Sequence, residues 1–309
     1  MLFKVIPILL LFGLGYLLGR RRYLSPTALA ELKKLVVEIA LPAALFLAFA
    51  RVAFEARLLV IPLILFSANL LVLLVSRRLA PKSWSGGRFF PYLLTGFEAG
   101  MLGYAIFAAV YGQENLHKFG LVDLGQVTFV FFILVPSLRE QGSQAQGAAE
   151  ALRSFFKTPV ILAILGGILF NQSGLQRLIS GQAWYASLES ALQMLGGAVA
   201  PLAALIIGSE LNLQRTSLLQ PLKTAFVRLL IWAPAGMAFS LLVAGPLLGL
   251  DSGYQAAVFV MAVLPPPFVI PLFMRPTNPE ETAYVVNTLS LSIVATLALF
   301  TLITLLFPP

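Results

Sequence analysis

Residues 94–104 read Leu-Thr-Gly-Phe-Glu-Ala-Gly-Met-Leu-Gly-Tyr, and they lie inside an apolar segment that runs from residue 89 to residue 111. Three glycines weaken a helix at this point, and the carboxylate of Glu98 is costly at membrane depth. A second stretch, 263–271, reads Val-Leu-Pro-Pro-Pro-Phe-Val-Ile-Pro. Three successive prolines cannot continue a helical hydrogen-bond ladder. Two helices that are interrupted in corresponding halves of a membrane protein predict a binding site where they cross.

Composition places the chain in a bilayer. Of its 309 residues, 59% are hydrophobic and 11% are charged, and the mean hydropathy is +0.91. That much apolar surface cannot be buried in a soluble core of this size, so lipid must cover part of it. The chain has no cysteine, which excludes disulfides and thiolate metal sites. The net charge of +8 would suggest a nucleic-acid partner in a soluble protein. Here the basic residues lie in short loops between apolar segments, so we read them as a topology signal and expect no nucleic-acid partner.

The apolar pattern predicts an all-α integral membrane protein with ten transmembrane helices, since a span needs roughly 20 residues. The expected spans are 2–19, 35–50, 58–75, 89–111, 119–138, 158–170, 188–208, 222–248, 254–274 and 282–307. Lysine and arginine concentrate in the loops after the odd-numbered spans, beginning with Arg20, Arg21 and Arg22. Positively charged loops stay in the cytoplasm, which places both termini outside it in a cell-membrane protein.

An internal repeat is expected because the most polar linker, 139–157, divides five spans from five. Residues 1–138 and 158–309 would form two repeats, and the second must be inverted because five is odd. Leu-Pro-Ala-Ala-Leu at 41–45 corresponds to Ala-Pro-Leu-Ala-Ala-Leu at 200–205, and Asp123 corresponds to Asn287. The interrupted spans four and nine occupy matching positions in the two repeats.

These features together resemble the auxin efflux carrier family, whose relatives include plant PIN carriers, bacterial malonate-type carriers and, more remotely, the sodium/bile acid symporters. The resemblance implies a scaffold of spans one, two, six and seven and a mobile transport domain of spans three to five and eight to ten. It also implies a homodimer through the scaffold helices. The chain departs from the family pattern near the span-four break, where Thr95 stands in place of an asparagine and Glu98 adds a charge.

The candidate site follows from the two breaks. Half-helix N-termini carry amides and partial positive charge that suit a carboxylate, while unwound carbonyls suit a cation. The expected substrate-binding residues are Thr95, Gly96, Phe97, Glu98, Gly100, Pro265, Pro266, Pro267 and Asn287. A buried acid is expected to be functional, so Glu98, Asp123 and Gln126 are candidates for coupling to a proton or to a sodium ion. No cofactor is expected other than a sodium ion at Glu98 and Asp123.

The predicted function is a secondary transporter that carries small organic anions, such as carboxylates or auxin-like acids, by alternating access. One alternative is a transporter of a cation or a cation-coupled substrate, because Glu98 and Asp123 make the site acidic. Another is a non-transporting membrane sensor with the same fold. No catalytic motif supports an enzyme.

Two further predictions concern single residues in the spans. Arg228, in span eight, either faces an anionic substrate or extends its side chain to the interface. Gly13, Gly15 and Gly19 in span one predict close helix packing.

Overall fold

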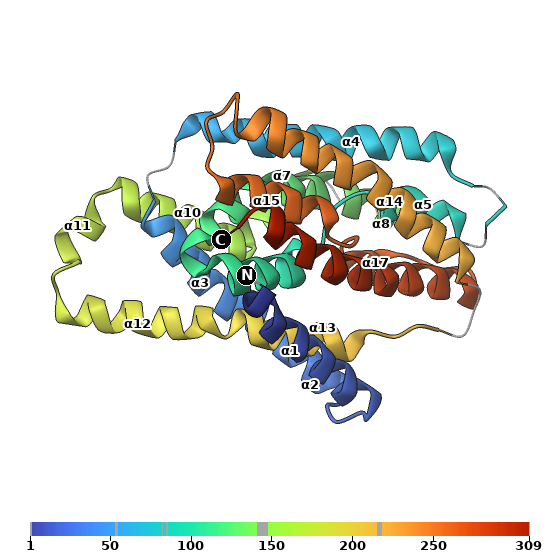
Figure 1. The fold of residues 1–309 in the computed structure, drawn as a ribbon, viewed down its shortest axis with the longest axis horizontal. Coiled ribbons are helices and arrows are strands. Elements are labelled where there is room, and N and C mark those ends of the chain that lie inside the picture. The colour runs from blue at the N-terminus through green and yellow to red at the C-terminus, as the bar shows by residue number, and fades with distance from the viewer. Residues whose placement is uncertain are drawn as a thin grey trace.

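A computed structural model describes residues 2–52, 55–81, 83–84, 86–140, 148–214 and 218–308. Figure 1 shows a molecule built of helices, and no strand occurs in these ranges. The predicted all-α membrane fold is therefore confirmed. Most of the predicted linker, residues 141–147, lies outside the described ranges.

The helices coincide with the expected spans. Spans one to five correspond to α1 (Leu2–Arg20), α2 to α3 (Pro26–Ala50), α4 (Val60–Leu79), α5 to α6 (Phe90–Tyr111) and α7 to α8 (Leu116–Glu140). Spans six to ten correspond to α10 (Pro159–Gln172), α12 to α13 (Ala183–Glu210), α14 (Leu219–Ala238), α15 to α16 (Ser252–Phe273) and α17 (Pro279–Leu306).

Only part of this set is long enough to cross a bilayer as one unbroken helix. Five described stretches meet that test by length and composition: Arg57–Leu79, Gln113–Arg139, Ala183–Glu210, Leu219–Ala244 and Pro279–Leu306. A pair bent by 66°, formed by α9 (Ala148–Lys157) and α10, adds a sixth if it counts as one span. The total of ten spans and the inverted repeat therefore remain predictions.

The helices pack in two groups (Figure 1). In the first, α1 lies along α13, and α3 (Leu41–Ala50) lies between α10 and α12. In the second, α4 packs on α7, and α14 packs on α15 and α17. The first group contains spans one, two, six and seven, and the second contains the other six. The family resemblance implies that the first group is a scaffold and the second a transport domain. We call the first group the scaffold below, and its role as a scaffold remains a prediction.

Small residues explain why α1 and α13 approach so closely. A Cβ atom added to Gly15 would lie 2.3 Å from the backbone oxygen of Leu205, and one added to Gly19 would lie 2.2 Å from that of Ser209. The expected close packing is confirmed at Gly15 and Gly19. It is wrong at Gly13, where an added Cβ atom would have nothing within 4 Å because this face of α1 does not meet another helix. A larger side chain at Gly15 or Gly19 would force the two scaffold helices apart.

Both predicted helix breaks are present. Span four begins with one short helix, α5 (Phe90–Leu93), and resumes as a π-helical turn, η4 (Ala99–Gly103), that leads into α6 (Tyr104–Tyr111). Span nine ends its first half, α15, at Val263 and resumes as α16 (Val269–Phe273). Pro265, Pro266 and Pro267 occupy the extended link between the halves, where an amide hydrogen is not needed.

Membrane orientation gives a first prediction. The exposed residues Arg21 and Ser180 lie in the loops after spans one and six. We expect Arg21→Cys to react with an impermeant thiol reagent only after the cytoplasmic face is opened, and Ser180→Cys to react in intact cells. The native chain has no cysteine, so it serves as the unlabelled control. Labelling of both variants from the same face would rule out the predicted topology.

Candidate functional site

Glu98 joins the two broken helices at their crossing. Its backbone amide donates to the carbonyl oxygen of Pro265 at 2.9 Å. One carboxylate oxygen, Oε2, accepts from the amide of Phe268 at 2.7 Å, and the other, Oε1, accepts from the amide of Met101 at 3.2 Å. These amides begin α16 and η4, so one carboxylate satisfies free N–H groups at the start of both second halves.

Gly96 allows the two breaks to touch. Its φ angle is +67°, in the left-handed region that disfavours any residue with a Cβ atom. A Cβ atom placed here would lie 2.6 Å from Cγ of Pro267. The amide of Gly96 donates to Oδ1 of Asn69, on α4, at 2.7 Å. The glycine therefore has both a conformational and a steric reason to be at this position.

Arg228 and Trp232, on α14, bind the carbonyl ends of the first halves. The Arg228 guanidinium donates to three backbone oxygens, those of Leu264 at 3.1 Å, Leu93 at 3.0 Å and Gly96. Trp232 Nε1 donates to the carbonyl of Leu94 at 2.7 Å. Arg228 is 1% exposed. The expectation that its side chain reaches the interface is therefore wrong, because the unwound carbonyls bind it in the interior.

Asp123 and Gln126, on α7, face the span-four break. Gln126 Nε2 donates to the carbonyl of Phe97 at 2.6 Å, and the Tyr104 hydroxyl donates to Oδ2 of Asp123 at 2.9 Å. The second oxygen of each side chain, Asp123 Oδ1 and Gln126 Oε1, is buried without a partner among the described residues. Such oxygens have unused capacity for a proton, a water molecule or a cation.

The crossing is partly exposed, and it contacts the scaffold. Gly100 and Phe268 are partly exposed there, and Glu98 retains 9% exposure. The η4 turn contacts α13 and the π-helical turn η1 (Val36–Ala40) of the scaffold. Lys33 and Glu210 form an ion pair on the scaffold. A solute bound where the crossing contacts the scaffold would lie between the two groups of helices.

Two of the predicted site residues have other partners. The Thr95 hydroxyl donates back to the carbonyl of Pro91 at 3.1 Å, which closes the last turn of the first half of span four. The side-chain oxygen of Asn287, Oδ1, accepts from the backbone amide of Gln214 at 2.7 Å, and its Nδ2 donates to the backbone carbonyl of Gln214 at 3.3 Å. Asn287 thus holds the segment that leads from α13 toward α14. The structure joins the rest of the predicted set at the crossing.

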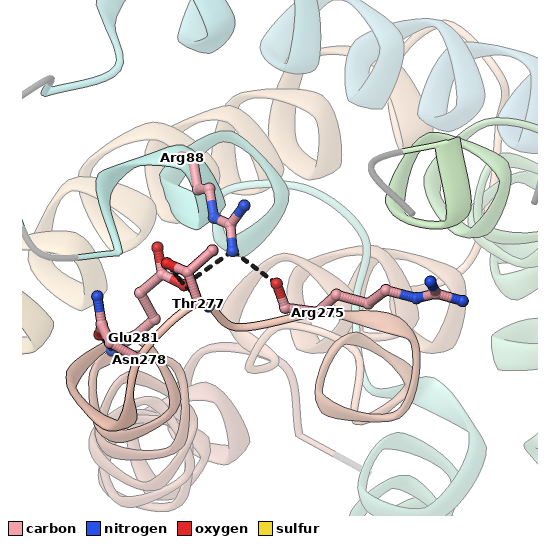
Figure 2. Close-up of polar contacts among 5 residues, drawn as sticks. All are labelled: Arg88, Arg275, Thr277, Asn278 and Glu281. Atoms are coloured by element: carbon pink, nitrogen blue, oxygen red, sulfur yellow. Dashed lines mark hydrogen bonds and ion pairs between the residues drawn. The ribbon is translucent and has the colours of Figure 1, made fainter. Parts of the chain in front are cut away.

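A polar cluster ties the ends of the broken helices together (Figure 2). Arg88, just before α5, donates to the carbonyl of Arg275 at 2.6 Å and to the Glu281 carboxylate at 2.8 Å. The Thr277 hydroxyl donates to the same carboxylate at 3.1 Å, and Asn278 caps α17 by accepting from the Glu281 amide at 2.9 Å. The start of span four is therefore fixed to the loop between spans nine and ten.

Sequence reasoning missed three contributors to the crossing. Asn69 lies in the middle of an apolar span, and an asparagine at such a position is itself a signal. The sequence carries no signal that Arg228 binds carbonyls or that Trp232 belongs to the site. Their partners are more than 25 residues away in the chain, and no spacing rule identifies them.

Comparisons with known proteins agree with this architecture. Residues 1–140 match the model of a family described as membrane transport protein. A protein of Methanothermobacter thermautotrophicus that is named an uncharacterized transporter is 28% identical over 238 residues, and the match covers 74% of each chain. These findings confirm the resemblance to auxin efflux carrier-like membrane transport proteins.

Proposed function

We propose that this multi-pass membrane protein, which is similar to auxin efflux carrier-like membrane transport proteins, is a secondary transporter of small organic anions. The substrate would bind where the crossing contacts the scaffold and reach either side of the membrane by alternating access. The observation that carries this proposal is the binding of one carboxylate, Glu98, by amides of both broken helices. The crossing is thus already shaped to hold a carboxyl group.

The charge of a nearby cavity supports an anion. A cavity of about 700 Å³ opens between the ends of α1 and α13 and the helix α17. Its lining includes Arg20, Arg22, Ser209, Asn212 and Ser290. Two arginines and three neutral polar groups raise the local concentration of small anions. A cavity that admitted cations would be expected to carry the opposite charge.

Glu98 supplies the coupling in this proposal. While it is ionised, its carboxylate occupies the amides of Met101 and Phe268 and repels a second anion. Protonation removes the charge and weakens its hold on these amides, so a substrate carboxylate can take its place. Each anion would then travel with one proton. A sodium ion is the other candidate, and the unpaired oxygens of Asp123 and Gln126 are the ligands that it would find.

A cationic substrate is the second candidate function. It is favoured by one observation, namely that an ionised Glu98 at a partly exposed edge would attract a cation. A non-transporting sensor would bind a solute at the same edge without moving it.

Uptake into proteoliposomes separates these functions. We expect labelled dicarboxylates or indole-3-acetate to enter faster with an inward proton gradient, and a sodium gradient to have no such effect. Empty liposomes and liposomes with a proton ionophore are the controls. Stimulation by sodium alone would favour the sodium site. Uptake of organic cations without anions would favour the cationic substrate, and binding without uptake would favour the sensor.

A further inference from the structure

We propose that Arg228 is a resident cation, which holds the carbonyl ends of both broken helices in the place where a carrier of this architecture would otherwise bind a metal cation. The inference deepens the proposed function. Its uptake measurements rest on that function, whereas its melting measurements do not. It predicts that the crossing is assembled without sodium. Arg228 is a positioning residue in this account, because it binds the backbone of the site and not the substrate.

The first step of the argument is the set of acceptors. Arg228 donates through Nε to Leu264, where α15 ends, and through Nη1 and Nη2 to Leu93 and Gly96 in span four. Helix C-termini carry partial negative charge, and both first halves end on this one guanidinium. A planar group with five donors can reach several carbonyls at once, which an ammonium ion on a flexible stem does less well.

The second step is that neighbouring carbonyls also have protein donors. Trp232 donates to the carbonyl of Leu94, and Gln126 donates to that of Phe97. Thr296 donates to the carbonyl of Val263, and the backbone amide of Glu98 donates to that of Pro265. Unwound carbonyls are the groups that coordinate cations in broken-helix carriers. Together with the three carbonyl oxygens that Arg228 binds, seven oxygens of the two breaks therefore already have a side chain or a backbone amide of this chain as their donor.

The third step is the charge. None of the ion pairs among the described residues includes Arg228. Its guanidinium lies over the ring of Phe97, 4.9 Å from the ring centroid, and that ring packs edge-on against Trp232. A buried cation is stable only if it is paired or hydrogen-bonded, and here backbone carbonyls and an aromatic face provide this stabilisation. The positive charge is therefore bound as a metal ion would be bound.

The fourth step is symmetry between the two charges. Arg228 binds the carbonyl ends of the first halves, and Glu98 binds the amide ends of the second halves. The fixed positive charge needs no ion from solution. The charge of Glu98 can change by protonation, so the pair predicts coupling to protons without sodium.

The test uses chemical rescue. We expect Arg228→Ala to melt at least about 5 °C below the wild type in detergent, and millimolar methylguanidinium to restore much of that loss while potassium at equal ionic strength does not. Arg51→Ala is the matched control, because Arg51 pairs with Glu189 at the scaffold periphery. Its melting temperature should not respond to methylguanidinium. Equal responses of the two variants would overturn the proposal.

Two further arms keep the outcome decisive. The wild type should have the same melting temperature and the same uptake rate in sodium, potassium and N-methylglucamine buffers, and stabilisation by sodium would overturn the proposal. If Arg228→Ala does not fold, Arg228→Lys should fold and remain independent of sodium, and sodium dependence would again contradict the proposal. If the wild type transports no organic anion, the proposed function fails, whereas the melting experiments still decide the role of Arg228.

Discussion

Replacing Gly96 by alanine is expected to abolish transport while the protein still inserts into the membrane. Two costs combine at this position. The left-handed backbone of Gly96 costs an L residue roughly 1–2 kcal/mol. The new Cβ atom would lie 2.6 Å from Cγ of Pro267, and overpacking of this kind typically costs about 1–3 kcal/mol more. The breaks must then move apart, and the pairing of Glu98 with both second halves is lost.

Gly13→Ala is the matched control for this change. A Cβ atom at Gly13 has nothing within 4 Å, so this variant should transport like the wild type. We expect uptake by Gly96→Ala to fall at least about tenfold, which corresponds to ~1.4 kcal/mol. Uptake and thermal stability should be measured on the same preparation. Wild-type uptake by Gly96→Ala would show that contact between the two breaks is not needed.

Replacing Glu98 by glutamine is expected to remove the pH dependence of uptake. In the wild type, anion uptake should fall as the pH rises through the range in which Glu98 loses its proton, because the deprotonated carboxylate competes for the amides of Met101 and Phe268. Glutamine cannot ionise, so its uptake should stay constant over this range. The carboxamide oxygen can accept one of the two amide bonds, and the lost bond should cost about 1–3 kcal/mol of stability.

Two other variants set the scale for Glu98→Gln. Glu189→Gln removes a carboxylate from a scaffold ion pair and should leave the pH profile unchanged. Asp123→Asn should weaken the pH dependence less than Glu98→Gln does, since Asp123 binds Tyr104 and not the helix ends. An unchanged pH profile in Glu98→Gln would mean that Glu98 only holds the loop.

Local chemistry explains why the helix breaks could be predicted. Three glycines around Glu98 weaken a helix, and three prolines at 265–267 cannot continue one, so both interruptions are visible in the sequence. The conflict between an apolar segment and Glu98 also predicts a functional position without any structure. The structure brings Glu98, Gly96 and the proline run together at one crossing, and their function there remains a prediction.

The partners of the breaks could not be predicted in the same way. Arg228 binds Gly96 across 132 residues of sequence, and the choice between substrate, interface and backbone depends on which helices pack together. Asn287 entered the predicted site through its correspondence to Asp123. Equivalent positions in a repeat do not guarantee equivalent contacts, and Asn287 pairs with Gln214.

The central claim is that a proton on Glu98 accompanies each substrate anion. Proteoliposomes that contain a trapped pH indicator test it directly, with the membrane potential clamped and no sodium present. The wild type should acidify the lumen when a transported dicarboxylate is added outside, and Glu98→Gln should take up the anion without acidification. Equal acidification by Glu98→Gln, or uptake without acidification by the wild type, would contradict the claim.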